Sequence, residues 1–262
     1  MKILLTGASG FVGRLVAEAL KELISENLDL VEVSRSHSER TFQLGESIDL
    51  RNQNFDMVIN CAYDFKQTTL ERSLTVNLEG TKKLLENSKA ANIPKFIQIS
   101  SHSAHQESLS IYGLTKQAVD DYLKTEEGTR IFRLGVVTSD TSEGFIGAID
   151  RVANKFPVVP VPNANSILLY ETPYSSLKYA LELEINNLLG DKCYNVGKAK
   201  IYTLGDFIKM RNPGQIVISI PASLAYRAFR FGEFLFKNFP FRSDSILSII
   251  AQAPLKQYEF IG

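Results

Sequence analysis

Hydrophobic and polar positions change their period along the first half of the chain. Short runs of Val, Ile, Leu and Phe alternate with longer segments whose apolar residues recur every three or four positions. The short runs predict strands at residues 3–5, 30–33, 57–61, 96–99 and 130–134, and the longer segments predict helices at 11–25, at 70–91 and from residue 111 onward. Strands that are apolar on both faces and separated by helices are typical of a parallel sheet covered on both sides. With right-handed crossovers, the pattern predicts an α/β protein with a doubly wound parallel sheet.

The pattern loosens after about residue 136. Helical patterns at 143–156, 174–188 and 204–211 are separated by a proline-rich stretch and by short apolar runs at 193–196 and 216–220. Two more helical patterns follow. We expect residues 1–165 to form the core, and residues 166–262 to complete the sheet and build a small C-terminal lobe.

Charge and cysteine usage narrow the class of protein. Acidic and basic residues number 29 each, so no overall field favours nucleic acid or a charged membrane surface. Cys61 and Cys193 fall in apolar runs, which indicates buried thiols in a reducing compartment. The start, MKILLTGASG, does not have the apolar run of a secretory signal, and no stretch approaches the ~20 apolar residues of a membrane span. We expect a soluble, cytoplasmic protein without nucleic-acid or membrane partners.

A glycine-rich turn, TGASGFVG, lies between the first predicted strand and the first predicted helix. Glycines at this spacing permit a tight turn, let the backbone approach a pyrophosphate and let the helix pack closely on the sheet. The N-terminus of the helix offers free N–H groups and a partial positive charge to phosphates. The turn therefore predicts that the core is a dinucleotide-binding, Rossmann-type core; the alternative is a structural loop that binds nothing. The cofactor contacts expected from it are Gly7, Ser9, Gly10, Phe11, Val12, Gly13 and Arg14.

The end of the second predicted strand bears on the choice between NAD and NADP. An acidic residue there hydrogen-bonds the ribose 2′-hydroxyl of NAD. This chain has Val33-Ser34-Arg35-Ser36 instead, and Arg14 follows the glycine turn. Guanidinium groups and small hydroxyls suit a 2′-phosphate, so we expect NADP, bound by Ser34 and Arg35. NAD stays open if Arg35 is only a solvated loop charge.

A tyrosine and a lysine stand four residues apart in the segment Ile111-Tyr112-Gly113-Leu114-Thr115-Lys116. They share one face of a predicted helix, so their head groups can reach one point. Such a pair arises by chance in most chains of this length. It indicates chemistry only together with other motifs.

The other motifs occur in order along the chain. The glycine turn fits TGxxGxxG, and Asn60-Cys61-Ala62 follows the third predicted strand. The segment VNLEGT, in the next predicted helix, contains Asn77. Ile99-Ser100-Ser101 ends the strand that precedes Tyr112. With this set the chain resembles the short-chain dehydrogenase/reductase superfamily, in particular its extended, NAD(P)-dependent epimerase/dehydratase-like branch. The resemblance covers nearly the whole chain and is tight to about residue 140. It implies a Rossmann fold, an NAD(P) cofactor and a sugar substrate, most plausibly a nucleotide sugar.

The resemblance also implies roles for single residues. Tyr112 would be the general acid or base, and Ser101 would hydrogen-bond the substrate oxygen. Lys116 would hydrogen-bond the nicotinamide ribose, and Asn77 would support the helix beside Lys116. Further cofactor contacts are implied for Asp49 and Leu50 near the adenine and for Cys61, Ala62 and Tyr63 near the ribose and nicotinamide. An ammonium and a cationic nicotinamide ring both favour phenolate, so we expect the pKa of Tyr112 to fall from about 10 toward the working range.

Departures from the family pattern narrow the type of reaction that the sequence predicts. Leu134 stands where proline is usual, so the turn beside the nicotinamide differs. His102-Ser103-Ala104 replaces the acidic pair of the dehydratases, which argues against dehydration. Epimerase and ketoreductase activities both stay open, and the basic Ser34-Arg35 signature favours reduction. The alternative is a non-catalytic dinucleotide-binding protein, such as a redox sensor or an assembly subunit.

Substrate contacts are expected from the lobe and from the loop after Cys61. Lys66, His102 and Arg242 are the candidates, and Arg227 and Arg230 could join Arg242 in binding a diphosphate. The segment SLAYRAFRFGEFLFKNFPFRSD mixes Arg, Glu and Lys with phenylalanine, which favours a lid on the sheet over a membrane-surface helix. The histidines lack the ligand spacing of a zinc site, so no metal is expected. A homodimer stays open.

Overall fold

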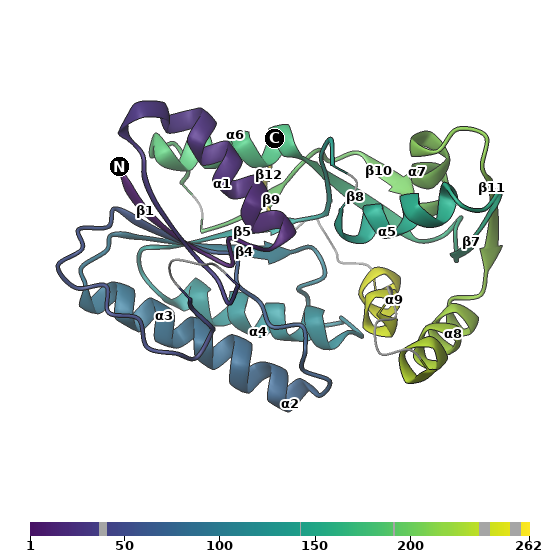
Figure 1. The fold of residues 1–262 in the computed structure, drawn as a ribbon, viewed down its shortest axis with the longest axis horizontal. Helices are drawn as coiled ribbons and strands as arrows, with labels where there is room; N and C mark the ends of the chain where they lie inside the picture. Colours follow the sequence, from purple (N-terminus) through teal and green to yellow (C-terminus); the bar gives the residue numbers. More distant parts are fainter. Residues whose placement is uncertain (37–40, 142, 191, 236–241, 252–257) are drawn as a thin grey trace.

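The computed structural model describes residues 1–36, 41–141, 143–190, 192–235, 242–251 and 258–262. A seven-stranded sheet forms its centre, in the spatial order β12-β9-β5-β4-β3-β1-β2 (Figure 1). The strands are β1 (Lys2–Thr6), β2 (Asp29–Val33), β3 (Met57–Asn60), β4 (Lys95–Ser101), β5 (Thr129–Leu134), β9 (Cys193–Val196) and β12 (Phe260–Ile261). Each pair of neighbours is parallel. The predicted doubly wound parallel sheet is confirmed, and its strand order reverses between β1 and β3.

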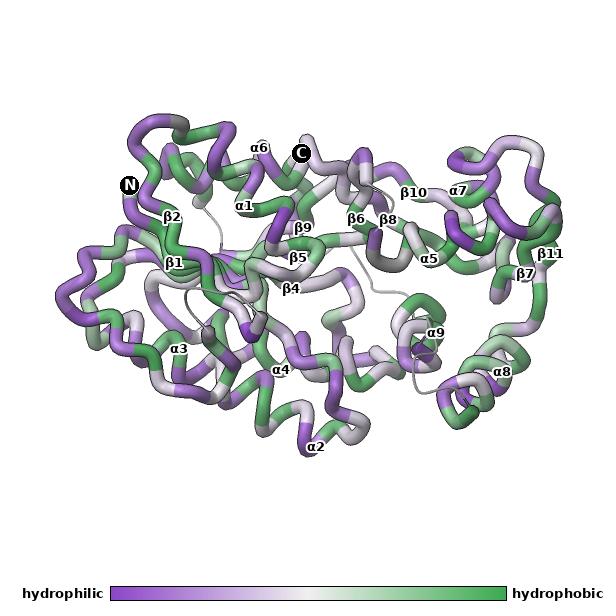
Figure 2. Tube along the Cα trace, viewed as in Figure 1, coloured by the Kyte–Doolittle hydropathy of each residue, from purple (hydrophilic) through white to green (hydrophobic). Residues whose placement is uncertain are grey.

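Two helical layers cover this sheet. Helices α1 (Phe11–Ile24) and α6 (Tyr174–Ile185) lie on one face, and α3 (Glu79–Ala90) and α4 (Ile111–Thr125) lie on the other (Figure 1). A short 3₁₀ turn, η1 (Ser25–Asn27), follows α1. Successive residues of a strand point to opposite faces, so Ile3 packs in the core beneath α1 and α6 while Leu4 packs in the core beneath α3 and α4. Figure 2 shows the hydrophobic positions along β1, β2 and β5 that supply both cores.

The helix predicted at 70–91 is interrupted. It begins as α2 (Leu70–Ser73), capped by the Thr69 side chain, passes through a π-helical turn, η2 (Leu74–Leu78), and continues as α3. Single π-helical turns inside α-helices occur frequently at functional sites. This one contains Asn77, one of the predicted site residues.

A smaller lobe lies beyond the carboxyl ends of the strands (Figure 1). It contains β6 (Val136–Thr138), α5 (Gly144–Ala153), β7 (Val158–Pro162), β8 (Leu168–Pro173), β10 (Ile201–Thr203), α7 (Leu204–Arg211), β11 (Ile216–Ile220), α8 (Ala222–Leu235) and α9 (Ser243–Ile250). Its strands form two small sheets, β10-β8-β6 and β11-β7, and its core includes Val159, Phe207 and Ile208. The expected boundary at residue 165 falls inside this lobe, because α5 and β7 belong to it while β9 and β12 return to the main sheet. Among the described residues, no helix has the length and apolarity to cross a bilayer.

Candidate active site

The glycine turn between β1 and α1 is sterically obligatory. Gly7 has a φ of 70°, and a Cβ there would lie 2.6 Å from the backbone nitrogen of Ala62. A Cβ on Gly13 would lie 2.2 Å from the carbonyl oxygen of Gly7. Backbone atoms cannot move aside as a flexible side chain can, so both positions require glycine. The first turn of α1 consequently lies close against the turn, with its N–H groups at the carboxyl edge of the sheet, and this cradle fits the pyrophosphate of a dinucleotide.

A cavity of about 210 Å³ opens beside this turn. Eight of the predicted cofactor residues line it: Gly7, Ser9, Gly10, Ser34, Arg35, Cys61, Ala62 and Tyr63. Five further lining residues were not predicted: Phe42, Gln43, Leu44, Asp64 and Phe65. The segment around Phe42 reaches the cavity because its N–H donates to the carbonyl of Ser34, 3.1 Å away, a tertiary contact that no local pattern signals.

Arg35 is paired within this cavity. Its Nη1 donates to the Asp64 carboxylate at 3.0 Å. Burial alone would raise the pKa of Asp64, but hydrogen bonds from Gln67 and from the Lys66 backbone, together with the charge of Arg35, hold it below its usual range. Asp64 is therefore ionised, and it neutralises part of the positive charge that Arg35 offers to a phosphate.

The remaining predicted cofactor residues lie around the cavity rather than in its lining. Arg14 donates to the Ser9 carbonyl and forms an ion pair with Glu143 before α5, so it connects the glycine turn to the lobe. Phe11 and Val12 begin α1 and pack on the core. Asp49 is paired with Arg51, which lowers the pKa of its carboxyl, and the Leu50 side chain is buried in the core.

Tyr112, Ser101 and Lys116 converge at the carboxyl end of β4. The side chain of Ser101 lies close enough to the Tyr112 hydroxyl to favour the ionised phenol. One turn along α4, the Lys116 ammonium donates to the carbonyl of Ile99 at 2.8 Å, and the residue is only 4 % exposed. Ser110 caps α4 by accepting from the Gly113 N–H at 2.9 Å, which fixes where the helix begins and so where Tyr112 stands.

Burial dominates the ionisation of this group. It raises the pKa of Tyr112 above its ordinary value, although the nearby Ser101 side chain acts in the opposite direction. This direction is opposite to the fall expected from the sequence, because Lys116 is turned to the Ile99 carbonyl and desolvation outweighs the favourable contacts. Burial also lowers the pKa of Lys116 to about 8, although Asp120 acts in the opposite direction. The phenol is therefore protonated at neutral pH.

A buried ion pair lies behind Lys116. Asp120 follows Lys116 by one helical turn and is completely buried, and its carboxylate lies 3.3 Å from Nε of Arg133 on β5. Burial raises the pKa of Asp120, although Arg133 lowers it. Sequence analysis missed Asp120, yet its spacing gave a signal: residues 112, 116 and 120 share one face of α4.

The loop after β3 covers the tyrosine ring. Tyr63 packs edge-on against Tyr112 at 5.0 Å between ring centroids, and Phe65 stacks on it at 5.5 Å. Asn77 holds this loop, since its side chain accepts from the Asp64 N–H at 2.7 Å and donates to the Asp64 carbonyl at 3.2 Å. The structure thus gives Asn77 a clear task, which is to fix the loop that faces Tyr112.

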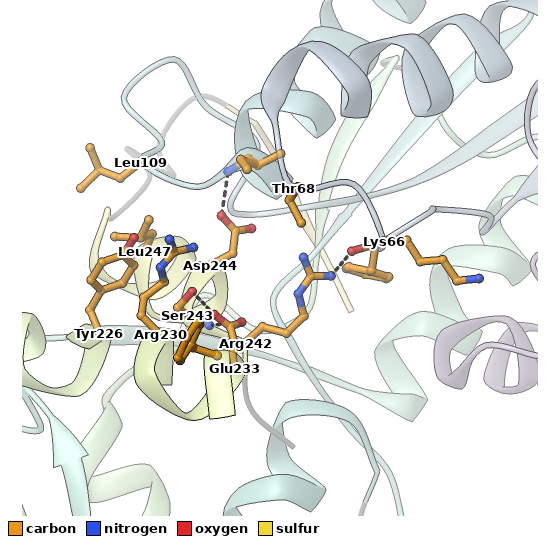
Figure 3. Close-up of a pocket in the computed structure, with 13 residues that line it drawn as sticks. Lys66, Thr68, Leu109, Tyr226, Arg230, Glu233, Arg242, Ser243, Asp244 and Leu247 are labelled. Atoms are coloured by element: carbon orange, nitrogen blue, oxygen red, sulfur yellow. Dashed lines mark hydrogen bonds between the residues drawn. The ribbon is translucent and has the colours of Figure 1, made fainter. Parts of the chain in front are cut away.

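A larger cavity, of about 760 Å³, lies on the other side of Phe65, between the core and helices α8 and α9 (Figure 3). Lys66 and Arg242, both predicted as substrate residues, line it. The Arg242 guanidinium lies over the Phe65 ring and donates to the Phe65 carbonyl. Asp244 of α9 accepts from the N–H groups of Ile111 and Tyr112, at 2.9 and 3.2 Å, so the lobe is joined directly to the helix that carries the tyrosine.

His102 lines a separate cavity of about 210 Å³, next to Ser101, Gly135 and Tyr170. Burial and the charge of Arg133 lower the pKa of His102 to about 3, so the imidazole is neutral at physiological pH. Among the described residues, no three His, Cys, Asp or Glu side chains gather in a way that could hold a metal ion.

Comparisons with known proteins agree with this architecture. The model of the NAD dependent epimerase/dehydratase family matches residues 3–137, just over half of the chain. A curated relative, the ceramide reductase of Caulobacter vibrioides, is 28% identical over 175 residues, covering 63% of this chain and 55% of that protein. The matched part therefore spans about half the length of that relative.

Solved structures share the fold. A dTDP-4-dehydrorhamnose reductase from Clostridium acetobutylicum superposes with a TM-score of 0.69 at 18% identity, covering 95% of this chain and 98% of that chain. The ADP-L-glycero-D-manno-heptose-6-epimerase of Helicobacter pylori gives a TM-score of 0.68 at 18% identity, covering 84% of each chain. The dTDP-4-dehydrorhamnose reductase of Bacillus anthracis, solved in complex with NADP, gives 0.67 at 16% identity, covering 94% of this chain and 97% of that chain.

Proposed function

The chain belongs to the NAD dependent epimerase/dehydratase family, and from this premise we propose that it is an NAD(P)-dependent oxidoreductase or epimerase in which Tyr112 is the general acid or base. It would transfer hydride to or from a carbonyl or alcohol of a sugar. The observation that carries this proposal is the placement of the Tyr112 hydroxyl beside the Ser101 side chain, with Lys116 one turn further along the same helix face. A sensor that only binds a dinucleotide has no use for a proton-transfer group at this place.

The residues of this chain divide the chemistry among themselves. A bound nicotinamide would supply or accept the hydride. Ser101 would hold the substrate oxygen beside the Tyr112 hydroxyl, and Tyr112 would give its proton to that oxygen as the carbonyl becomes an alcohol. Lys116 would stabilise the phenolate that remains. The buried phenol keeps its proton at neutral pH, which is the state that a proton donor in reduction needs.

For the cofactor we favour NADP, with Arg35 as the residue that distinguishes it from NAD. The guanidinium lines the cavity beside the glycine turn, where a 2′-phosphate could replace the Asp64 carboxylate as its partner. Fluorescence titration with NADPH and NADH tests this. Arg35→Ser should weaken NADPH binding about tenfold or more and leave NADH binding within about twofold. Tighter binding of NADH by the wild type would overturn this preference.

For the substrate we favour a nucleotide sugar. Lys66, Arg230 and Arg242 line the large cavity, which lies across Phe65 from Tyr112, and such groups bind phosphates. A second candidate substrate is a lipid carbonyl, which the sequence similarity to a ceramide reductase supports. Both candidates use the same proton donor.

The decisive experiment is an activity screen over keto sugars, nucleotide sugars and keto lipids with each cofactor. Tyr112→Phe removes the proton and keeps the ring, so it should lower turnover at least about a hundredfold. Tyr179→Phe on α6, where the ring is 47 % exposed, is the matched control and should retain full activity. Equal turnover of the Tyr112 variant and the wild type would remove Tyr112 from the mechanism.

A further inference from the structure

The first turn of α4, the helix that carries Tyr112, is completed from the lobe. The N–H groups of the first turn of a helix have no partner inside that helix. The Gly113 N–H donates to the Ser110 hydroxyl at 2.9 Å, a cap within the same segment. The N–H groups of Ile111 and Tyr112 donate instead to the two carboxylate oxygens of Asp244 in α9, at 2.9 and 3.2 Å. Two N–H groups at the start of α4 therefore depend on a residue of the lobe.

Arg242, two residues before Asp244, holds the side chain that covers the Tyr112 ring. Its guanidinium donates to the Phe65 carbonyl and lies 5.6 Å from the centre of the Phe65 ring (Figure 3). That ring stacks on Tyr112 with 5.5 Å between centroids. One short segment of the lobe therefore acts on the tyrosine by two routes, through its backbone N–H and through the aromatic ring stacked on it.

Ser243, which lies between these two residues, anchors the segment to the rest of the lobe. It is buried, and its N–H and hydroxyl donate to the two carboxylate oxygens of Glu233 in α8, at 3.0 and 2.7 Å (Figure 3). We call Arg242, Ser243 and Asp244 the clamp. Its middle residue is held by the lobe, while its two outer residues hold the core. The position of the lobe is therefore transmitted to the surroundings of the tyrosine.

We propose that Asp244 is a positioning residue for Tyr112, because its carboxylate fixes the first turn of α4 and so keeps the tyrosine beside Ser101 only while the lobe is docked on the core. The inference rests on the proposed function, in which Tyr112 is the general acid or base. A carboxylate suits this task, since a charged acceptor strengthens hydrogen bonds from backbone N–H groups and negative charge is favoured at a helix N-terminus. Asp244 would act through the place of the phenol, and a displacement of reacting groups by about 1 Å lowers a rate about a hundredfold.

Amide hydrogen exchange of the full chain, followed by NMR, tests the contact without substrate or cofactor. In Asp244→Ala the N–H groups of Ile111 and Tyr112 should exchange at least about tenfold faster than in the wild type. The Gly113 N–H should stay within about threefold of the wild type, because Ser110 still accepts from it.

The Tyr112 ring reports its own position. In protein labelled with fluorotyrosine, the fluorine resonance that Tyr112→Phe removes should shift in Asp244→Ala. Asp244→Asn keeps one acceptor oxygen, so it should change the exchange rates and the fluorine resonance less than Asp244→Ala does. This conservative variant also tests the proposal should the alanine variant not fold.

Asp206→Ala is the matched control, because Asp206 is an exposed aspartate in the first turn of α7, in the same lobe, and accepts from the Thr203 hydroxyl. It should leave the exchange rates and the fluorine resonance as they are in the wild type. With the substrate that the activity screen identifies, Asp244→Ala should lower kcat at least about tenfold and change KM less than about threefold. Asp244→Asn should recover part of the lost kcat, and Asp206→Ala should keep all of it.

Equal exchange rates and an unshifted fluorine resonance in Asp244→Ala and the control would overturn the proposal. A wild-type kcat in Asp244→Ala, where Tyr112→Phe is inactive, would overturn it as well. Full activity of Tyr112→Phe would instead overturn the proposed function, and the exchange and fluorine measurements would still decide whether Asp244 holds Tyr112 in place.

Discussion

Replacing the buried lysine of the site should make the protein more stable and inactive. Lys116 is 4 % exposed, and burial lowers its pKa from 10.5 to about 8. At 1.36 kcal/mol per pH unit, the charged form is disfavoured in the folded protein by about 3 kcal/mol. Lys116→Met removes this cost and keeps a flexible side chain of similar length.

The stabilising interactions that Lys116→Met removes contribute less free energy than the burial of the charge costs. Lys116 donates to the Ile99 carbonyl, and a bond of this kind stabilises by about 1 kcal/mol. That carbonyl keeps a second donor, the Gln98 side chain at 2.8 Å, so it is not left unpaired. We therefore expect Lys116→Met to raise the free energy of unfolding by about 2 kcal/mol at about pH 7, while activity falls at least about a hundredfold.

The pH dependence gives the sharper test. Below about pH 8 the lysine is charged in both the folded and the unfolded state, and the folded wild type carries the full cost. Between about pH 8 and 10.5 the folded state loses its proton before the unfolded state does, so the wild type gains stability and the advantage of the variant disappears. Urea unfolding of both proteins across this range measures the difference. Lys155→Met, at an exposed position after α5, is the control and should show no such dependence. A Lys116 variant less stable than wild type at neutral pH, or a difference that does not change with pH, would refute the reasoning.

Three other changes test the packing around the site. Arg133→Met should lower the free energy of unfolding by about 3–5 kcal/mol, because it leaves the Asp120 carboxylate buried without its partner. Adding Asp120→Asn should recover part of that loss, as measured by urea unfolding. No recovery in the double variant would contradict the ion pair. Burial raises the pKa of Cys61 to about 12, so iodoacetamide at neutral pH should label it in the unfolded protein and not in the native one, as peptide mass analysis would show. Gly13→Ala places a carbon 2.2 Å from a backbone oxygen of the glycine turn and should weaken NADPH binding at least about tenfold. Gly190→Ala is the control, because its added carbon would have no atom within 4 Å, and it should bind NADPH as the wild type does. Equal NADPH binding by the two variants would contradict a closely packed turn.

The sequence by itself determined the strands of the main sheet other than β12, together with the glycine turn. Strands that are apolar on both faces are recognisable in short runs, and the glycines are required by contacts within a dozen residues or by the packing of the turn on the next strand. The spacing of Tyr112 and Lys116 is likewise a property of a single helix. Such features are local, so the order of residues is sufficient to predict them.

Only the tertiary structure decided the surroundings of these residues. It paired Arg35 with Asp64, placed Phe65 on the Tyr112 ring, and brought Asp244 to the start of α4 from 133 residues further along the chain. The same long-range packing desolvates Tyr112 and so raises a pKa that the local sequence suggested would fall. It also turned Glu233 inward and left the apolar side of α8 outside. Burial and charge pairing depend on which distant segments of the chain pack together, and the local hydrophobic periodicity of the sequence does not predict such contacts.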